Sequence, residues 1–215
     1  MAKDGSKGMK TRMRHEERRA SIVQSAIRLF AEKGFRGATT RELAASLGVT
    51  EPVLYQHFAT KDDLYAAIIA AKIAEGSERT AELQKLLEGE DDRAILAHIA
   101  ALILDRYEHD PAFIRLLLFS ALERHELGRQ FYGTHVKGFY EMIAAYLRRR
   151  IRAGAFRAVN ATVAARSFMG MVQEHGLTAE LFGPQPPRIA RARLIDEIVA
   201  IFLDGIRVQP LGETK

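Results

Sequence analysis

An all-α fold of about nine helices is predicted for this chain of 215 residues by three features of its sequence. Apolar residues recur every three to four positions in almost every segment, which is the period of an amphipathic helix. No segment shows the alternation of apolar and polar residues that half-buried strands require. Capping residues and glycines stand at the ends of the periodic segments, where helices begin and end.

The first predicted helix begins near Glu16 and ends at Gly34. Residues 1–15 before it are small, polar and basic, and we expect them to be disordered because they have little apolar surface to bury. The helix itself has one apolar face, which would pack against the helices that follow. That face carries Ile22, Ala26, Leu29 and Phe30.

Two short helices are predicted next, joined by a tight Gly-Val-Thr turn that begins at Gly48. Thr39 and Glu42 have the spacing of a capping box at the start of the first. Thr50 is the expected cap of the second, and Pro52 lies in its first turn, where a missing N–H costs nothing. The second helix has only about two turns, so contacts with the core must stabilise it. The residues expected to make those contacts are Val49, Leu54 and Phe58.

The remainder of the chain is predicted to be helical as well. Residues 60–63 give another capping pattern, which opens a long connecting helix over about 61–87. After a joint at 89–92, further periodic segments follow, and a Gly- and Pro-rich linker at 183–187 precedes the last one. These segments lie around 95–102, from Asp110, around 139–147, from Asn160, and over 188–207.

Basic residues are concentrated at the N-terminal end. Residues 1–42 hold eleven Lys and Arg against five Asp and Glu, a net charge of +6, although the whole chain carries only +5. Such a cluster suits a polyanion such as DNA, because each neutralised phosphate releases counterions. A solvated basic tail is the alternative that charge alone leaves open.

The composition also excludes several classes of protein. The chain has no cysteine, which removes disulfide scaffolds and thiolate sites and suits a reducing cytoplasm. The longest apolar stretch, 94–104, is too short to span a membrane, and the N-terminus does not resemble a signal peptide. No nucleophile elbow, phosphate-binding loop or His-Glu-x-x-His motif is present. We therefore expect a cytoplasmic protein that is not an enzyme, has no metal or cofactor, and does not bind a membrane.

The two short helices and their turn have the spacing of a helix-turn-helix, in which the second helix enters the major groove of DNA. Residues 39–58 (TTRELAASLGVTEPVLYQHF), followed by Lys61, resemble the DNA-binding signature of the tetracycline-repressor (TetR) family. The resemblance extends over about Glu16 to Leu64, and the Leu-Tyr-x-His-Phe run is its most specific part. Beyond Leu64 the chain resembles the family only in having a helical domain of suitable length.

This resemblance implies a bacterial transcription regulator with a helix-turn-helix domain at 16–62 and an effector-binding and dimerisation domain at 63–215. The expected partners are double-stranded DNA, a small-molecule effector and a second copy of the chain. The expected activity is repression, with release from a palindromic operator when the effector binds. The alternatives are an activator, a regulator with a protein effector, or a helical interaction module without DNA binding.

The resemblance also assigns roles in DNA binding to individual residues. Glu51 and Gln56 depart from the family pattern, because relatives often have basic residues at these two positions. For Tyr55 and His57, the alternative to DNA binding is packing against the long helix. The residues at phosphate-contacting positions are Thr40, Tyr55, His57 and Lys61. Those at base-reading positions are Arg41, Glu51, Pro52, Val53 and Gln56, and Thr39 and Thr50 at the helix starts complete the predicted set.

Predicted inner faces of the C-terminal helices supply the candidates for an effector pocket, which needs apolar walls and a few polar groups. The apolar candidates are Phe113, Leu117, Phe139, Met142, Tyr146, Phe168 and Met171, and the polar ones are Arg124, Glu174 and His175. Each apolar candidate has the alternative of being plain core.

The last two helices are apolar over much of their circumference, which suits a symmetric dimer interface or, alternatively, a hairpin folded onto its own subunit. The interface candidates are Phe168, Val172, Ile195, Ile198, Val199 and Phe202. For the arginines at 148–150 and 152, which precede Gly154, we favour a role at a helix C-terminus over a second nucleic-acid site.

Overall fold

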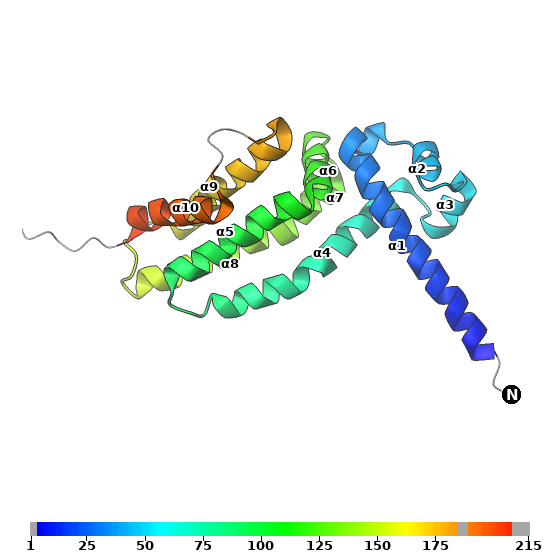
Figure 1. Ribbon diagram of the computed structural model, residues 1–215. Coiled ribbons are helices and arrows are strands. Elements are labelled where there is room, and N and C mark those ends of the chain that lie inside the picture. Colours follow the sequence, from blue (N-terminus) through cyan, green and yellow to red (C-terminus); the bar gives the residue numbers. More distant parts are fainter. Residues whose placement is uncertain (1–3, 185–188, 208–215) are drawn as a thin grey trace, which may run out of the picture. The chain divides into compact units, whose positions relative to one another are not determined.

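The computed structural model describes residues 4–184 and 189–207, with side chains from His15 onward. Within these ranges it is built of α-helices, one short π-helix and a single isolated β-bridge between Phe156 and Arg207, so the predicted all-α class is confirmed (Figure 1). The first six helices are α1 (Asp4–Gly37), α2 (Thr40–Ser46), α3 (Glu51–His57), α4 (Lys61–Leu86), α5 (Asp92–His109) and α6 (Pro111–Leu122). They are followed by α7 (Glu126–Phe131), the π-helix η1 (Tyr132–Val136), α8 (Lys137–Arg152), α9 (Ala161–Phe182) and α10 (Arg191–Ile206).

The chain forms two compact units, and the first combines residues 1–75 with residues 112–131. It therefore contains α6 and α7 as well as the N-terminal helices, whereas the sequence placed everything after residue 62 in one C-terminal domain. The reason is the apolar face at the start of α4, which buries Tyr65 and Ile68. Phe113 and Leu116 of α6 are buried in the same unit, and the Tyr65 hydroxyl donates to the Leu116 carbonyl at 3.4 Å.

Helix α1 begins at Asp4 instead of near Glu16, so residues 4–15, predicted to be disordered, are helical in the structure. Lysine, arginine and methionine, which are common in this stretch, are good helix formers. The predicted stop is confirmed, because Gly34 has φ +71° and kinks the helix before the final turn at 35–37. This left-handed conformation suits glycine.

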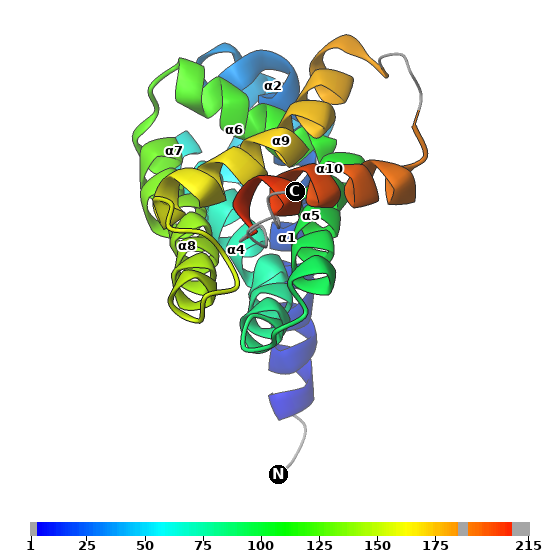
Figure 2. The ribbon, with the colours of Figure 1, turned by 90° about the vertical axis from the view of Figure 1, so that its left-hand side faces the viewer.

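The second unit contains residues 76–111 and 132–215. Helix α9 packs against α8 and α5, and α10 packs against α5 and α9 (Figure 2). At the contact of α9 with α5, Gly176 lies so close to the Tyr107 ring that an added Cβ atom would stand 2.5 Å from it. Within the described part of the chain, no helix combines the length and apolar character that crossing a bilayer requires.

The arginine-rich end of α8 binds the segment that joins α4 to α5. Arg149 donates to the carbonyls of Leu87 and Gly89 at 2.7 and 2.5 Å. Arg150 donates through Nε to the buried Asp92 carboxylate at 2.7 Å, and Asp92 also accepts the Tyr146 hydroxyl. The predicted cap glycine after these arginines, Gly154, has φ +75°. These contacts give Arg149 and Arg150 a structural role in holding the segment between α4 and α5, which the sequence did not indicate.

Candidate nucleic-acid interface

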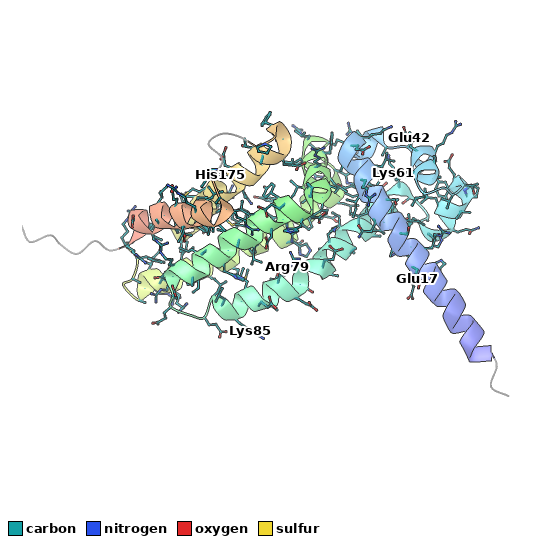
Figure 3. All side chains as sticks on the ribbon, viewed as in Figure 1. Glu17, Glu42, Lys61, Arg79, Lys85 and His175 are labelled. Atoms are coloured by element: carbon teal, nitrogen blue, oxygen red, sulfur yellow. The ribbon has the colours of Figure 1, made fainter. Side chains whose placement is uncertain are left out.

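Helix α2 begins with the predicted capping box. The Glu42 backbone N–H donates to the Thr39 hydroxyl at 3.2 Å, and the Thr39 N–H donates to the Glu42 carboxylate at 3.0 Å. Lys33 of α1 also donates to Glu42, and this hydrogen bond is the largest cause that lowers the pKa of Glu42 to about 2, followed by the bonds from Thr39 (Figure 3). Glu42 of the capping box therefore also joins α2 to α1, in addition to capping the N-terminus of α2.

The turn and α3 also follow the predicted pattern. Gly48 has φ +63°, and Thr50 has the extended backbone of an N-cap residue, although its side chain makes no capping hydrogen bond. Leu54 is only 2% exposed and Phe58 is buried beside it, so the predicted anchors of this short helix are in place. Val49 is half-buried.

The remaining side chains of α3 form its outer face. Pro52, Tyr55 and Gln56 are exposed, with Tyr55 at 46%, while Glu51, Val53 and His57 are half-buried. On α2, Arg41 is exposed, and the Thr40 hydroxyl donates to the Glu51 carboxylate at 2.8 Å. This bond joins two predicted DNA-binding residues and fixes α3 relative to α2.

Lys61, a predicted phosphate contact, has partners inside the protein. Its Nζ donates to the carbonyls of Phe35 and Ala38 at 2.6 and 3.0 Å, and lies 4.2 Å from the centre of the Phe35 ring. Lys61 thus caps the end of α1 from the first turn of α4 (Figure 3). The sequence did not indicate this role, because the contact spans more than twenty residues.

His57 lies at the end of α3, against the N-terminal half of α1. Its ring centre is 4.4 Å from that of His15, and its Nδ1 is buried without a hydrogen-bond partner. Burial is the first cause that lowers the pKa of His57, followed by the positive charges of His15, Arg18 and Arg19. Arg19 also lies 4.6 Å over the ring of Phe58, the C-cap of α3.

The turn between α6 and α7 contacts the helix-turn-helix region within the first unit. The Glu123 carboxylate accepts the backbone N–H groups of Phe35 and Arg36 at 3.1 and 3.2 Å. The His125 ring packs on Phe35 and Tyr65, and its Nε2 lies 3.4 Å from the Asp62 carboxylate. These contacts could not be predicted from the sequence, because Glu123 and Phe35 are 88 residues apart.

The predicted effector residues are divided between the two units. Phe113, Leu117 and Arg124 belong to the first, and the other seven belong to the second. Phe139, Met142 and Met171 pack partly buried against a core that contains Tyr146 and Phe168. The polar candidates Arg124, Glu174 and His175 are exposed in the single chain, and Figure 3 labels His175 on α9. Arg124 lies two residues after the end of α6 and has φ +55°.

The predicted interface residues lie mainly inside their own subunit. Ile195 is half-buried, and the other five are buried, because the apolar stripes of α9 and α10 face the core of the second unit. Those five are Phe168, Val172, Ile198, Val199 and Phe202. Other apolar side chains on the same two helices are exposed, among them Val163 at 59% and Ile201 at 64%.

One group of side chains among the described residues has the spacing of metal ligands, namely Asp105, Glu108 and His109. Arg191 donates to Asp105 at 2.5 Å and to Glu108 at 2.8 Å. An arginine thus already neutralises both carboxylates, and we treat the group as an ion-pair network between α5 and α10.

The fold and the α2–turn–α3 geometry define a helix-turn-helix protein with a second helical unit. The family described as bacterial regulatory proteins, tetR family, matches residues 22–68, and the AefR-like transcriptional repressor C-terminal domain matches residues 93–205, more than half of the chain. The chain therefore belongs to the TetR family, as its sequence indicated.

Individual relatives agree with this assignment. The chain is 33% identical to the nucleoid occlusion factor SlmA of Citrobacter koseri over 162 residues, which cover 73% of this chain and 79% of SlmA. It is 32% identical over 106 residues to the HTH-type transcriptional activator FasR of Mycolicibacterium smegmatis. This match covers 49% of this chain and 48% of FasR, so the chain spans about half the length of that relative. The fold is similar to that of AibR, solved in complex with isovaleryl coenzyme A and operator DNA, with a TM-score of 0.68 and 22% identity over 86% of this chain and 97% of AibR.

Proposed function

We propose that this protein is a cytoplasmic transcription regulator that binds operator DNA through α3 and has no catalytic activity. The observation that carries the proposal is the outer face of α3, where Pro52, Tyr55 and Gln56 are exposed on a two-turn helix held by Leu54 and Phe58. A rigid helix with exposed side chains of this kind suits the major groove. Membership of a family of regulatory proteins supports the same function.

Base reading falls to the residues whose side chains are exposed. Arg41 can donate two hydrogen bonds to guanine, and Gln56 can pair with adenine. Glu51 has a different part, because its bond with Thr40 engages one carboxylate oxygen and leaves the other for a cytosine amino group. Tyr55 is exposed enough to reach a phosphate, and Lys61 acts through its cap on α1.

Operator binding with duplexes from upstream of the protein's own gene tests this function. Arg41→Ala should lower the preference for that duplex over a scrambled one by about tenfold or more, because one bidentate base contact is worth roughly 1–3 kcal/mol. Arg28→Ala, which removes an exposed arginine from α1, is the matched control and should leave the preference unchanged. If the wild-type protein binds no duplex even at low salt, the proposed function is wrong.

A dimer follows from the same proposal, since a palindromic operator needs two copies of α3. Val163 of α9 and Ile201 of α10 are exposed apolar residues on the last two helices, and so are Leu181 and Phe182 at the end of α9. We place the interface on these side chains instead of on the buried ones. Ile201→Glu should convert the dimer to a monomer, which halves the mass of the particle measured by sedimentation. Leu122→Glu, at an 81% exposed leucine of α6, should not, and equal masses for both variants would refute this interface.

Repression relieved by a small-molecule effector is the form of regulation that we propose. The match to a repressor C-terminal domain over residues 93–205 supports repression, and the complex of AibR with a coenzyme A thioester supports a small effector. Activation is the second candidate, because FasR is an activator. Deleting the gene should raise transcription from the bound promoter if the protein represses, and lower it if the protein activates.

A further inference from the structure

Helix α1 extends well beyond the helix-turn-helix and carries cations to the end of α3. His15, Arg18 and Arg19 are exposed and lie three and four residues apart, so they share one face of the helix. Glu17 comes two residues after His15, which at 3.6 residues per turn places it on the opposite side (Figure 3). Glu16 lies three residues before Arg19 and therefore borders this face, which carries three basic residues against this one acidic residue.

Two contacts in the structure show that this basic face meets α3. The ring centres of His15 and His57 are 4.4 Å apart, and the Arg19 guanidinium lies 4.6 Å from the centre of the Phe58 ring. Arg18 is close enough to act on His57 electrostatically. The positive charges of His15, Arg18 and Arg19 act on His57, so these four groups lie close enough to repel one another when they are charged.

We propose that His15, Arg18 and Arg19 of α1, together with His57 of α3, form a phosphate patch that binds the DNA backbone beside the groove that α3 enters. This inference rests on the proposed function and adds a contact made by α1 outside the helix-turn-helix. The backbone phosphates run along both edges of the major groove, so cations at the end of a groove-reading helix lie where phosphates are found.

Salt-dependent binding of Arg18→Gln tests the patch, with fluorescence anisotropy on the duplex from upstream of the gene and on a scrambled duplex. Loss of one phosphate contact should reduce the slope of log K against log salt by about 0.9 and weaken binding roughly fivefold on both duplexes at low salt. Arg18→Lys should restore the slope. The matched control is Arg28→Gln, which removes the same charge from an exposed position of the same helix and should not change the slope.

The outcomes separate the two proposals. If the wild type binds and Arg18→Gln keeps the wild-type slope, the phosphate patch is wrong while the proposed function stands. If Arg28→Gln lowers the slope as much as Arg18→Gln, the effect is one of net charge and the patch is also wrong. If the wild type binds neither duplex, the proposed function fails and the patch fails with it.

Discussion

At the scale of single residues, several side chains in the first unit join the proposed DNA-binding surface to the structure beneath it. Glu51 is a predicted base-reading residue that also bonds Thr40, and Lys61 holds the last carbonyls of α1. Because such residues contribute to folding and to binding, a loss of affinity after their replacement does not identify a DNA contact. Exposed residues without these bonds, such as Arg41 and Gln56, separate the two effects.

His57 gives the protein a pH dependence whose sign follows from its contacts. Burial and the charges of His15, Arg18 and Arg19 hold its pKa below the ordinary value of 6.5, so the folded protein binds fewer protons at this residue than the unfolded chain. The stability of the free protein should therefore fall as the pH drops below about 6.5, until the pH passes the lower folded-state pKa. When the pH is lowered from about 8 to about 5, the free energy of unfolding measured by thermal unfolding should decrease less in His57→Gln than in the wild type.

DNA should reverse this effect, because a phosphate near His57 favours its charged form. Wild-type affinity for the duplex should rise as the pH falls through this range, and the rise should be smaller in His57→Gln. The other histidines titrate in both proteins, so only the difference between them reports on His57. Equal pH profiles for the two proteins would exclude this coupling.

At the scale of helices, the sequence predicted the starts that local chemistry determines. The capping box of Thr39 and Glu42 and the corresponding one of Thr60 and Asp63 are present as expected. Helix α7 was not predicted, since its six residues are too few to show a helical period. The early start of α1 was missed because composition indicated disorder for a stretch of good helix formers.

The contact between α5 and α9 depends on the absence of a side chain at Gly176. Gly176→Ala would place a Cβ atom 2.5 Å from Tyr107, and we expect a loss of about 1–3 kcal/mol in the free energy of unfolding, despite the better helix propensity of alanine. Gly138→Ala in α8 is the control, because nothing lies within 4 Å of its added Cβ atom. The free energy of unfolding of that variant, measured by denaturant titration, should rise by roughly 0.5–1 kcal/mol. A gain in both variants would show that the ring moves aside freely.

At the scale of the whole molecule, the surfaces between copies and around an effector were the hardest to predict. Helical periodicity identifies which side of α9 and α10 is apolar, but it does not say whether that side meets its own subunit or another. Phe168 and Val199 are buried in their own unit, and Val163 and Ile201 are left exposed. For the effector candidates, too, periodicity does not separate a pocket wall from plain core. Tyr146, for example, donates its hydroxyl hydrogen bond to Asp92 within the core.

The chain passes between the two units within α4, at the start of α6 and at the end of α7. Residues 112–131 therefore connect to the second unit at both of their ends. The turn between α6 and α7, in the middle of this segment, contacts the helix-turn-helix region. Glu123 makes that contact by accepting two N–H groups at the end of α1, beside Gly34, where an added Cβ atom would stand 2.5 Å from the carboxylate. An effector can act on DNA binding only if it favours one arrangement of such connections over another.

Glu123→Gln should weaken this connection without changing the size of the side chain. We expect the free energy of unfolding to fall by about 1–2 kcal/mol, because hydrogen bonds to a charged acceptor are stronger than those to a neutral one. Hydrogen exchange at the Phe35 and Arg36 amides should accelerate, and operator affinity should fall with it, since α1 holds α2 and α3. Glu126→Gln, at an exposed glutamate of α7, provides the control. Unchanged exchange at both amides in Glu123→Gln would mean that the α6–α7 turn does not hold the end of α1, and that a signal from the second unit must travel along α4 instead.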